Sequence, residues 1–511
     1  MKNKNFYITT PIYYPSGQPH MGHAYSSIIA DVFARYKRND NYDVYFLTGT
    51  DEHGLKIQNA AKINNLDPLA YCDKISKVFK DLTKKLNLSN DDFIRTTEKR
   101  HHRAVNDLWN RLVKSGDIYL SKYKGWYSVS DEAYYSPDEI VDKEGKKFSS
   151  FSGSEVEWVE EESFFFKLSA WEKKLLDFYD KNEKFILPIS RRNEVINFVK
   201  SGLKDLSVSR TSFTWGIKVP KNNKHIIYVW LDALTNYLSA LNFPNTKDML
   251  YKKFWPASLH VIGKDILRFH AVYWPAFLLA AKINPPQRVF GHGWILSGDE
   301  KMSKSKGNIL NPIEIIDNYG IDELRYYLMK EVSHGSDGSV SLKSLENCIN
   351  SDLANNYGNL CQRIFSFIKN NCNNEVKKTG KLSTQDQNLI KETDLLTKDL
   401  RNYMNEQNLN AYIKSVINIS FLTNKYINDE EPWKLKKENP EKMNNILHLS
   451  LEQISKISIL LNPIIPSSSS KVLDALNVTN EARNLSFLDG SNILKDKVKI
   501  NQLNILFKKI I

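Results

Sequence analysis

The sequence predicts an α/β protein in which a parallel sheet is interrupted by a β-rich insertion and followed by a helical bundle. Three observations support this fold class. A strand-like run over residues 6–10 leads through a turn into a helix-like run over 24–38. From about residue 117 to 204, aromatic and polar residues alternate, which favours short antiparallel strands. Beyond residue 345 helical periodicity dominates, so this part is predicted to be a bundle and not a second sheet domain.

The turn after the first strand predicts a ligand site. Phe6–Thr10 is aromatic and β-branched, as expected of a buried strand. The following helix carries apolar residues at helical spacing, namely Ile28, Ile29, Val32, Phe33 and Tyr36. Residues 20–23 between them read His-Met-Gly-His; Gly22 lets the backbone approach a ligand, and the helix N-terminus offers amides to a phosphate. The imidazoles can donate hydrogen bonds there, although so short a pattern also arises by chance.

A second signature lies far downstream, where residues 301–305 read Lys-Met-Ser-Lys-Ser. The ordinary interpretation of two nearby lysines is a solvated basic turn. Met302 between them is unusual for such a turn, and the flanking Gly298 and Gly307 predict a mobile loop of the kind that closes over phosphates.

With both signatures in this order, the sequence resembles class I aminoacyl-tRNA synthetases, and methionyl-tRNA synthetases in particular, from about residue 5 to the C-terminus. The resemblance implies a ligase that activates L-methionine with ATP to methionyl-adenylate and transfers it to the 3′ end of tRNA(Met), including initiator tRNA. AMP and pyrophosphate would be released. It implies catalytic roles for His20 and His23 on the α-phosphate side and for Lys301 and Lys304 on the pyrophosphate. Gly22 and Lys304, with both histidines, would bind ATP, and Mg²⁺ would arrive with ATP, not in a protein cage.

The next strand, Val44–Thr48, ends in a turn at 50–54 that reads Thr-Asp-Glu-His-Gly. Ligands in open α/β sheets bind beyond the carboxyl ends of strands, so this turn is expected near the first. Asp51 suits a substrate ammonium, but on spacing alone it suits equally well the N-cap of a helix that begins near Leu55. The resemblance favours the ligand role, because in the family this turn lies in the amino-acid site.

Three residues fall on one helical face: Trp230, Ala233 and Tyr237. Such a stripe is usually part of the core. In methionyl-tRNA synthetases these positions surround the methionine side chain. The rest of that pocket is matched by Ile12, Tyr14 and His270. A soft, apolar thioether gains from contacts with aromatic rings, so the chemistry suits the assignment.

A ribose site is predicted where the strand 259–262 ends in Gly263, close to Asp265. Gly-x-Asp is common in turns, so the pattern by itself is a weak signal. The resemblance implies that both residues bind ATP.

Helices are predicted at 67–86 and 98–115, before an insertion that resembles the family's connective peptide. Many methionine enzymes carry zinc-binding Cys-x-x-Cys knuckles in this region. Residues 127–131 read Tyr-Ser-Val-Ser-Asp, without the thiolates that zinc needs. The sequence therefore resembles the zinc-free bacterial subgroup, and no structural zinc is expected.

In the C-terminal region Asn355, Asn359 and Arg363 are spaced one helical turn apart. Such a row can hydrogen-bond the base edges of a splayed loop. Trp433, if exposed, would give a base a stacking platform. A hydrophilic helix face and a buried tryptophan are the competing interpretations, and the match to the family's anticodon helix favours anticodon binding for all four residues.

The composition is consistent with a polyanionic partner. The chain has 511 residues, 41% hydrophobic, and a formal net charge of +12, which suits tRNA but also a generally basic proteome. Its four cysteines form no Cys-x-x-Cys pair and are expected to be reduced. The first strand begins at once, leaving no room for a signal peptide, and the longest apolar run, 271–281, is too short to span a bilayer. A cytoplasmic monomer without membrane contact is expected.

The predicted domains are a Rossmann-like catalytic domain in two halves, a connective insertion, a lysine-loop and stem-contact region, and a helical anticodon-binding domain. The two catalytic halves are expected at 1–116 and 206–290, and the connective insertion at 117–205. The lysine-loop and stem-contact region is expected at 291–345, and the anticodon-binding domain at 346–511.

Two alternative functions stay open. A related synthetase would keep both signatures around a different pocket, although Trp230, Tyr237 and the absence of a large editing domain speak against isoleucine, leucine or valine. A non-catalytic tRNA-binding protein would lose the histidines and lysines, which are present.

Overall fold

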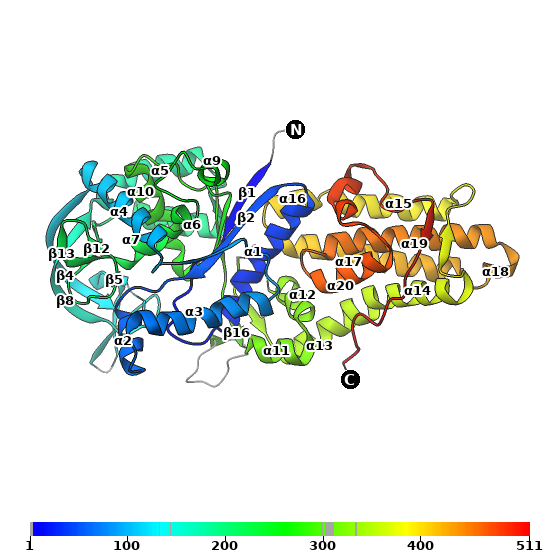
Figure 1. Ribbon diagram of the computed structural model, residues 1–511, viewed down its shortest axis with the longest axis horizontal. Helices are drawn as coiled ribbons and strands as arrows, with labels where there is room; N and C mark the ends of the chain where they lie inside the picture. The colour runs from blue at the N-terminus through cyan, green and yellow to red at the C-terminus, as the bar shows by residue number, and fades with distance from the viewer. Residues whose placement is uncertain are drawn as a thin grey trace. The chain divides into compact units, whose positions relative to one another are not determined.

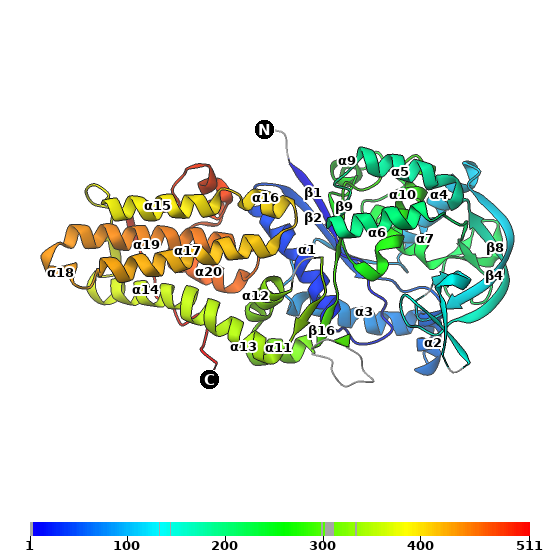
Figure 2. The same cartoon turned by 180° about the vertical axis from the view of Figure 1, so that it is seen from behind.

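The computed structural model describes residues 4–131, 133–143, 145–297, 300–301, 311–332 and 335–510. The chain divides into two compact units. Residues 5–19 and 45–292 are here called the sheet unit, and residues 1–4, 20–44 and 293–511 the bundle unit. Figures 1 and 2 show the elements of each unit from two sides. Across the described part of the chain, no helix combines the length and the apolar character needed to cross a membrane.

The sheet unit is built on a six-stranded sheet. In order across the sheet, its strands are β3 (Asp92–Arg95), β2 (Asp43–Thr50), β1 (Asn5–Thr9), β14 (Leu259–Gly263), β15 (Val289–His292) and β9 (Ile186–Leu187). The pairs β2–β3, β1–β14, β14–β15 and β15–β9 are parallel. The strands β2 and β3 lie on one side of β1, and the strands from later in the chain, β9, β14 and β15, lie on its other side, so a topological switch point lies between β1 and β14. Ligands of open parallel sheets bind beyond the carboxyl ends of strands at such a point. The parallel sheet predicted from the sequence is confirmed.

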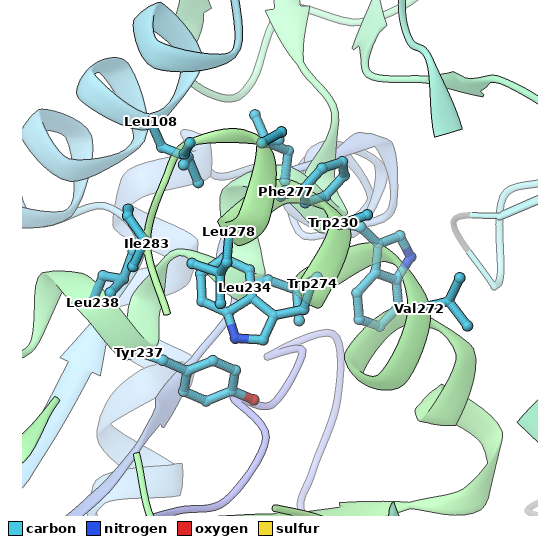
Figure 3. Close-up of a cluster of buried hydrophobic side chains, with 14 of the residues drawn as sticks. Leu108, Trp230, Leu234, Tyr237, Leu238, Val272, Trp274, Phe277, Leu278 and Ile283 are labelled. Atoms are coloured by element: carbon cyan, nitrogen blue, oxygen red, sulfur yellow. The ribbon is translucent and has the colours of Figure 1, made fainter. Parts of the chain in front are cut away.

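The core of the sheet unit is aromatic around α10 (Trp274–Ala280). Trp274 is fully buried, and its ring centroid lies 6.1 Å from that of Tyr237. Tyr237 belongs to α8 (Asn236–Ser239), which follows α7 (Val229–Leu234). Figure 3 shows side chains of α10 in one cluster with side chains of α7 and α8, among them Trp274, Leu278, Leu234 and Tyr237. The single helix predicted over 230–237 is therefore two short helices, and every residue of both is buried.

The helices between β2 and the insertion follow the prediction closely. α3 (Pro68–Lys85) and α4 (Lys99–Lys114) each end within one residue of the predicted bounds. Asp67 caps α3 by accepting a hydrogen bond from the Leu69 amide (2.9 Å), and Gly116 follows α4 with a φ of +77°, a conformation that favours glycine. The remaining described elements of this unit include α2 (Leu55–Ile63), α5 (Glu172–Lys181), α6 (Ile189–Lys200), α9 (Met249–Phe254), β11 (Ser209–Arg210), β12 (Lys218–Val219) and β13 (Asn222–Ile227).

The insertion is an antiparallel sheet in the order β10, β8, β4, β5. The antiparallel arrangement is as predicted, but two of its strands are long. β4 and β8 pair along almost their whole length, and Figure 1 shows them running together. Lysine and glutamate face each other across this pair, with Lys124 Nζ 2.9 Å from Glu160 Oε2, and such opposite charges stabilise strand pairing. The bounds are β4 (Ile118–Ser128), β5 (Ala133–Tyr135), β8 (Glu157–Phe166) and β10 (Leu206–Ser207), with a hairpin of β6 (Ile140–Lys143) and β7 (Lys146–Ser149).

Hydroxyl groups hold the segment of the insertion where the sequence lacks thiolates. The Asp131 carboxylate accepts hydrogen bonds from the hydroxyls of Tyr135 (2.8 Å), Ser152 (2.5 Å) and Ser154 (2.8 Å). We call these four residues the hydroxyl cluster. It ties the loop before β5, which carries Asp131, to Tyr135 of β5 and to the loop after β7, which carries Ser152 and Ser154.

The bundle unit combines α1 (Met21–Asn39) with the C-terminal helices. Figures 1 and 2 both show α14, α15, α17 and α19 lying side by side. The described helices of the bundle are α13 (Leu342–Cys348), the π-helix η6 (Ile349–Gly358), α14 (Asn359–Asn371), α15 (Thr384–Thr397), α16 (Leu400–Asn405), α17 (Leu409–Glu430), α18 (Leu435–Glu438), α19 (Pro440–Leu461) and α20 (Pro466–Ala475). This unit also holds α11 (Pro312–Tyr319), α12 (Ile321–Glu331), β16 (Ile295–Ser297), β17 (Glu300–Lys301), β18 (Gly338–Val340), β19 (Glu375–Lys377) and β20 (Lys497–Lys499). The helical C-terminal region predicted from periodicity is confirmed.

A buried ion pair joins α1 to α12 within the bundle unit. Arg325 Nη2 lies 2.6 Å from Asp31 Oδ2, and both side chains are inaccessible to solvent. Arg325 also donates to the carbonyl oxygens of Pro463 and Ile464, both at 2.8 Å. Burying an unpaired guanidinium would cost several kcal/mol. These partners therefore fix α1 against the start of the bundle.

Candidate functional site

The histidine turn is held by hydrogen bonds between its own backbone amides and its two imidazole rings. His20 is the N-cap of α1, with its Nδ1 accepting from the Gly22 amide (3.1 Å), while the His20 amide donates to Nδ1 of His23 (3.1 Å). An accepting ring nitrogen carries no proton, so both rings hold theirs on Nε2 and are N–H donors there. A Cβ on Gly22 would lie 3.0 Å from His20 Cε1, so glycine permits this tight cap. The cap also explains why α1 begins at Met21, earlier than the predicted residue 24.

The candidate methionine residues all belong to the sheet unit, and Tyr237 and His270 are bonded to each other. Tyr237 Oη lies 2.8 Å from His270 Nε2, and His270 Nδ1 lies 2.9 Å from the carbonyl oxygen of Ile266. The carbonyl can only accept, so Nδ1 carries the proton and Nε2 accepts from the Tyr237 hydroxyl. Burial lowers the pKa of His270 to about 4. At neutral pH this side of the site is therefore uncharged.

Trp230 forms the aromatic wall of the same region. Its ring stacks on Phe269 with centroids 3.7 Å apart and planes 5° apart, and it meets His270 edge-on at 6.4 Å. Ala233, one turn further along α7, is buried and adds no bulk. Stacked and edge-on rings of this kind form a rigid surface. The structure thus brings Trp230, Ala233, Tyr237 and His270 together in one part of the core.

Asp51 does not cap the helix that follows it. The N-cap of α2 is Gly54, three residues after Asp51, so the N-cap interpretation of Asp51 is wrong. Asp51 is 2% exposed, and its amide donates to the carbonyl oxygen of Tyr13 (2.9 Å). That bond connects the 50–54 turn to the segment holding Ile12 and Tyr14, which are partly buried against the same core. The ammonium-binding role of Asp51 stays a prediction.

Gly263 and Asp265 stand at the carboxyl end of β14, beside the switch point. A Cβ on Gly263 would lie 2.5 Å from Asp265 Oδ1, so only glycine lets the carboxylate fold back over the strand end. Asp265 itself is exposed. An exposed carboxylate at this position can accept hydrogen bonds from ribose hydroxyls.

The lysine loop lies largely outside the described residues. Lys301 is the last residue of β17 (Glu300–Lys301), and Lys304 is not among the residues that the structure describes. Their predicted roles stay predictions.

The candidate anticodon residues belong to the bundle unit. Asn355 and Asn359 are exposed at the junction of η6 and α14, and Trp433 is 43% exposed. The interpretation of Trp433 as a core residue is therefore wrong. The Arg363 guanidinium lies 5.8 Å from the Trp433 ring centroid and donates to Asn428 Oδ1 at 2.8 Å. A cationic group over an exposed ring suits the stacking and base-edge contacts of single-stranded RNA.

Two contacts near these sites were not predicted. His260 stacks on Tyr237 with centroids 4.1 Å apart, and burial holds the pKa of His260 well below its usual range. Asn428 orients Arg363 from a helix 65 residues further along the chain. No local pattern marks either residue, because each acts through a partner distant in the sequence.

Comparisons with known proteins agree along the whole chain. A family model described as tRNA synthetases class I (M) matches residues 6–365, and one described as the anticodon binding domain of methionyl tRNA ligase matches residues 376–511. The methionine–tRNA ligase of Rickettsia typhi is 49% identical over 513 residues, covering 100% of both chains. That of Brucella suis is 48% identical over 484 residues, covering 94% of each.

Solved structures give the same result. Mycobacterium tuberculosis methionyl-tRNA synthetase in complex with methionyl-adenylate superposes with a TM-score of 0.96 at 42% identity, covering 99% of both chains. The apo form of that enzyme gives a TM-score of 0.89 at 39% identity, covering 99% of this chain and 98% of the other.

Proposed function

The chain belongs to the methionyl-tRNA synthetases of class I, and from this premise we propose how its own residues carry out the family reaction. The protein activates L-methionine with ATP to methionyl-adenylate and transfers the methionyl group to the 3′ end of tRNA. Pyrophosphate leaves in the first step and AMP in the second.

The uncharged aromatic wall is the observation that supports methionine recognition most strongly. Trp230 stacked on Phe269, with Tyr237 bonded to a neutral His270, offers polarisable rings and no net charge to a thioether. A charged group here would disfavour an apolar side chain. The remaining wall is formed by Ile12, Tyr14 and Ala233. The substrate ammonium binds Asp51.

The chemical step needs positioning and charge stabilisation more than covalent help from the protein. A methionine carboxylate oxygen attacks the α-phosphorus of ATP, the new P–O bond forms, and the bond to the bridging oxygen of pyrophosphate breaks. His20 and His23 donate from Nε2–H to the α-phosphate, whose negative charge grows in the transition state. Lys301 and Lys304 stabilise the departing pyrophosphate, and Mg²⁺ enters with ATP. Gly22 and Gly263 admit the nucleotide backbone, and Asp265 accepts from the ribose.

The tRNA side of the reaction uses the bundle unit. Asn355, Asn359, Arg363 and Trp433 bind the anticodon of tRNA(Met), including initiator tRNA. The domain bounds predicted from the sequence are part of the same proposal. The enzyme acts as a cytoplasmic monomer and contains no structural zinc.

Pyrophosphate exchange tests the assignment directly. Labelled pyrophosphate should enter ATP only when methionine is added, in a panel of all twenty amino acids and without tRNA. Exchange with a different amino acid would identify a related synthetase. Failure of exchange with every amino acid, with tRNA binding retained, would contradict an enzymatic role.

A further inference from the structure

Two residues of the 50–54 turn, Glu52 and His53, are buried and have no part in the reaction described above. His53 reaches across to α7: its Nδ1 lies 2.7 Å from Asp232 Oδ2. Asp232 stands between Trp230 and Ala233, so the helix that carries the thioether wall is tied to the turn that carries Asp51.

The other carboxylate oxygen of Asp232 is bound as well. His101 Nε2 lies 2.6 Å from Asp232 Oδ1, and His101 Nδ1 lies 2.9 Å from the Ser239 hydroxyl on α8. Burial by itself would raise the pKa of Asp232, but the neighbouring His53 and the hydrogen bonds from His101 and His53 hold it below its usual range. An ionised carboxylate only accepts, so both facing ring nitrogens carry protons. Asp232, His53 and His101 are here called the carboxylate bridge, and all three side chains are nearly or fully buried.

Glu52 holds the turn from the opposite direction. Its carboxylate accepts from Arg95 Nε (2.7 Å) and from the hydroxyls of Thr97 (2.6 Å) and Thr50 (2.7 Å). Asp51 is therefore followed directly by two anchored residues, Glu52 and His53, so the backbone that presents it cannot shift without breaking hydrogen bonds to buried charged groups.

We propose that the carboxylate bridge sets the distance between Asp51 and the wall of Trp230 and Ala233, and so selects the length of the amino-acid side chain. This inference rests on the proposed methionine site. One end of the substrate, its ammonium, is held at the turn, and the other end, its side chain, is held at α7. The bridge links these two elements directly. His53, Asp232 and His101 are positioning residues, since they touch the site only through their neighbours.

A packing contact alone does not provide the same constraint. Apolar surfaces slide at little cost, whereas a carboxylate with a partner on each oxygen has one low-energy arrangement. Burying such a group carries a cost in desolvation, and specificity of arrangement is an attested use of that cost. An apolar pocket discriminates between substrates that differ by one methylene by about ten- to two-hundred-fold. Small changes in the distance between Asp51 and the wall of Trp230 and Ala233 should therefore be measurable as changes in substrate preference.

The test compares His53→Ala with His53→Asn in methionine-dependent pyrophosphate exchange. The asparagine amide can place an N–H donor near the position of His53 Nδ1, whereas alanine removes it. We expect His53→Ala to raise the KM for methionine roughly ten- to a hundred-fold, the range for loss of a charged hydrogen bond, with kcat and the KM for ATP close to the parent values. Its preference for methionine over ethionine, which is one methylene longer, and S-methylcysteine, one methylene shorter, should fall about tenfold. His53→Asn should recover most of both losses.

Leu175→Ala is the matched control. Leu175 is a fully buried residue of α5 in the same core, so its truncation lowers stability without touching the bridge. It should lower the melting temperature and leave side-chain preference unchanged. If His53→Ala does not fold, His101→Ala and His101→Gln form an equivalent pair, because the glutamine amide reaches the position of Nε2. Unchanged preference in the alanine variants, or equal behaviour of each pair, would overturn the inference. A parent enzyme without methionine-dependent exchange would instead refute the proposed function itself.

Discussion

Two buried histidines of the sheet unit, His270 and His260, leave the aromatic region around Trp230 and Tyr237 without charge. His270 and His260 are buried, and burial lowers the pKa of each, so both rings are neutral near pH 7. Asp51 directly follows β2, and we expect it to bind the ammonium of the amino acid. The protonation of both histidines thus follows from their burial, and the side-chain end of the proposed methionine site is uncharged.

Lys304 carries the most direct prediction for the chemical step. A charged contact made mainly in the transition state contributes about 2–4 kcal/mol. Lys304→Ala should therefore slow adenylate formation several-hundred-fold, measured in single turnovers, while methionine affinity stays nearly normal. Lys381→Ala, an exposed lysine of the bundle unit, is the control and should match the parent. Adenylate formation at the parent rate in Lys304→Ala would remove the lysine from the mechanism.

His270 predicts how stability depends on pH. Its folded-state pKa is about 4, whereas an unfolded histidine titrates near 6.5. Between these values the unfolded chain binds a proton that the folded chain does not, so stability falls as pH falls from 6.5 towards 4. The loss from this residue reaches at most about 3 kcal/mol at pH 4. His270→Gln can still accept from Tyr237 but has no such proton. Melting temperatures at pH 7 and pH 4.5 should differ less for this variant than for the parent; an equal difference would exclude His270 as a source of the acid sensitivity.

The limits of sequence reasoning at this scale are clear from Asp51, Trp433 and Asp232. Spacing alone allowed Asp51 to be a helix cap, and only the backbone showed that Gly54 holds that position. Exposure of Trp433 depends on tertiary packing, which periodicity does not determine. The Asp232 side chain meets His53 and His101 across 179 and 131 residues of chain, and no local pattern predicts such a meeting. Residue types and turn positions were predictable, but partners distant in sequence were not.

At the level of elements, the helical segment that begins with α13 changes from the π-helix η6 to the α-helix α14, and exposed asparagines lie around this change. Asn355 and Asn359 are exposed on either side of the change from η6 to α14, while Asn356 and Tyr357 between them are buried. Strands and helices were predicted within a few residues where apolar periodicity was strong, as in α3 and α4. The π-helix was not predicted, because its hydrogen-bond pattern leaves little trace in the order of residues.

Trp433→Ala tests the anticodon face. Stacking of one base on an aromatic ring contributes roughly 1–3 kcal/mol, so tRNA charging should fall about ten- to a hundred-fold. Pyrophosphate exchange needs no tRNA and should stay close to the parent value. Because Trp433 is 43% exposed, the melting temperature should change little. Leu395→Ala, an exposed apolar residue of α15, serves as the control for charging. Equal losses in pyrophosphate exchange and in tRNA charging would contradict the assignment of Trp433 to anticodon binding.

For the molecule as a whole, the formal net charge of +12 attracts a polyanion at long range. Fold class and the division between a sheet-based and a helical region could be read from the sequence, because they depend on periodicity summed over long stretches. The grouping of α1 with the bundle unit could not, since it rests on contacts between residues far apart in the sequence, such as the buried pair of Asp31 and Arg325, 294 residues apart.

The charge predicts that salt separates the two steps of the reaction. If several lysines and arginines neutralise tRNA phosphates, raising the salt from about 50 to 200 mM should weaken tRNA binding roughly ten- to a hundred-fold through counterion release. Exchange of pyrophosphate, which involves only small substrates, should change by much less. The KM for tRNA and the exchange rate, measured at the same salt concentrations, provide the comparison. A parallel decline of both would place the dominant charge effect at the nucleotide site instead.

The hydroxyl cluster of the insertion has a consequence for oxidative chemistry. Thiolates that hold a metal are targets for peroxides and for thiol reagents, and losing one of them loses the ion. The oxygens of Asp131, Tyr135, Ser152 and Ser154 undergo neither reaction. Burial meanwhile raises the pKa of all four cysteines, to about 12 for Cys348, so few thiolates exist to be oxidised at neutral pH. An enzyme built in this way should continue to charge tRNA under oxidant exposure that would unfold a thiolate-based insertion.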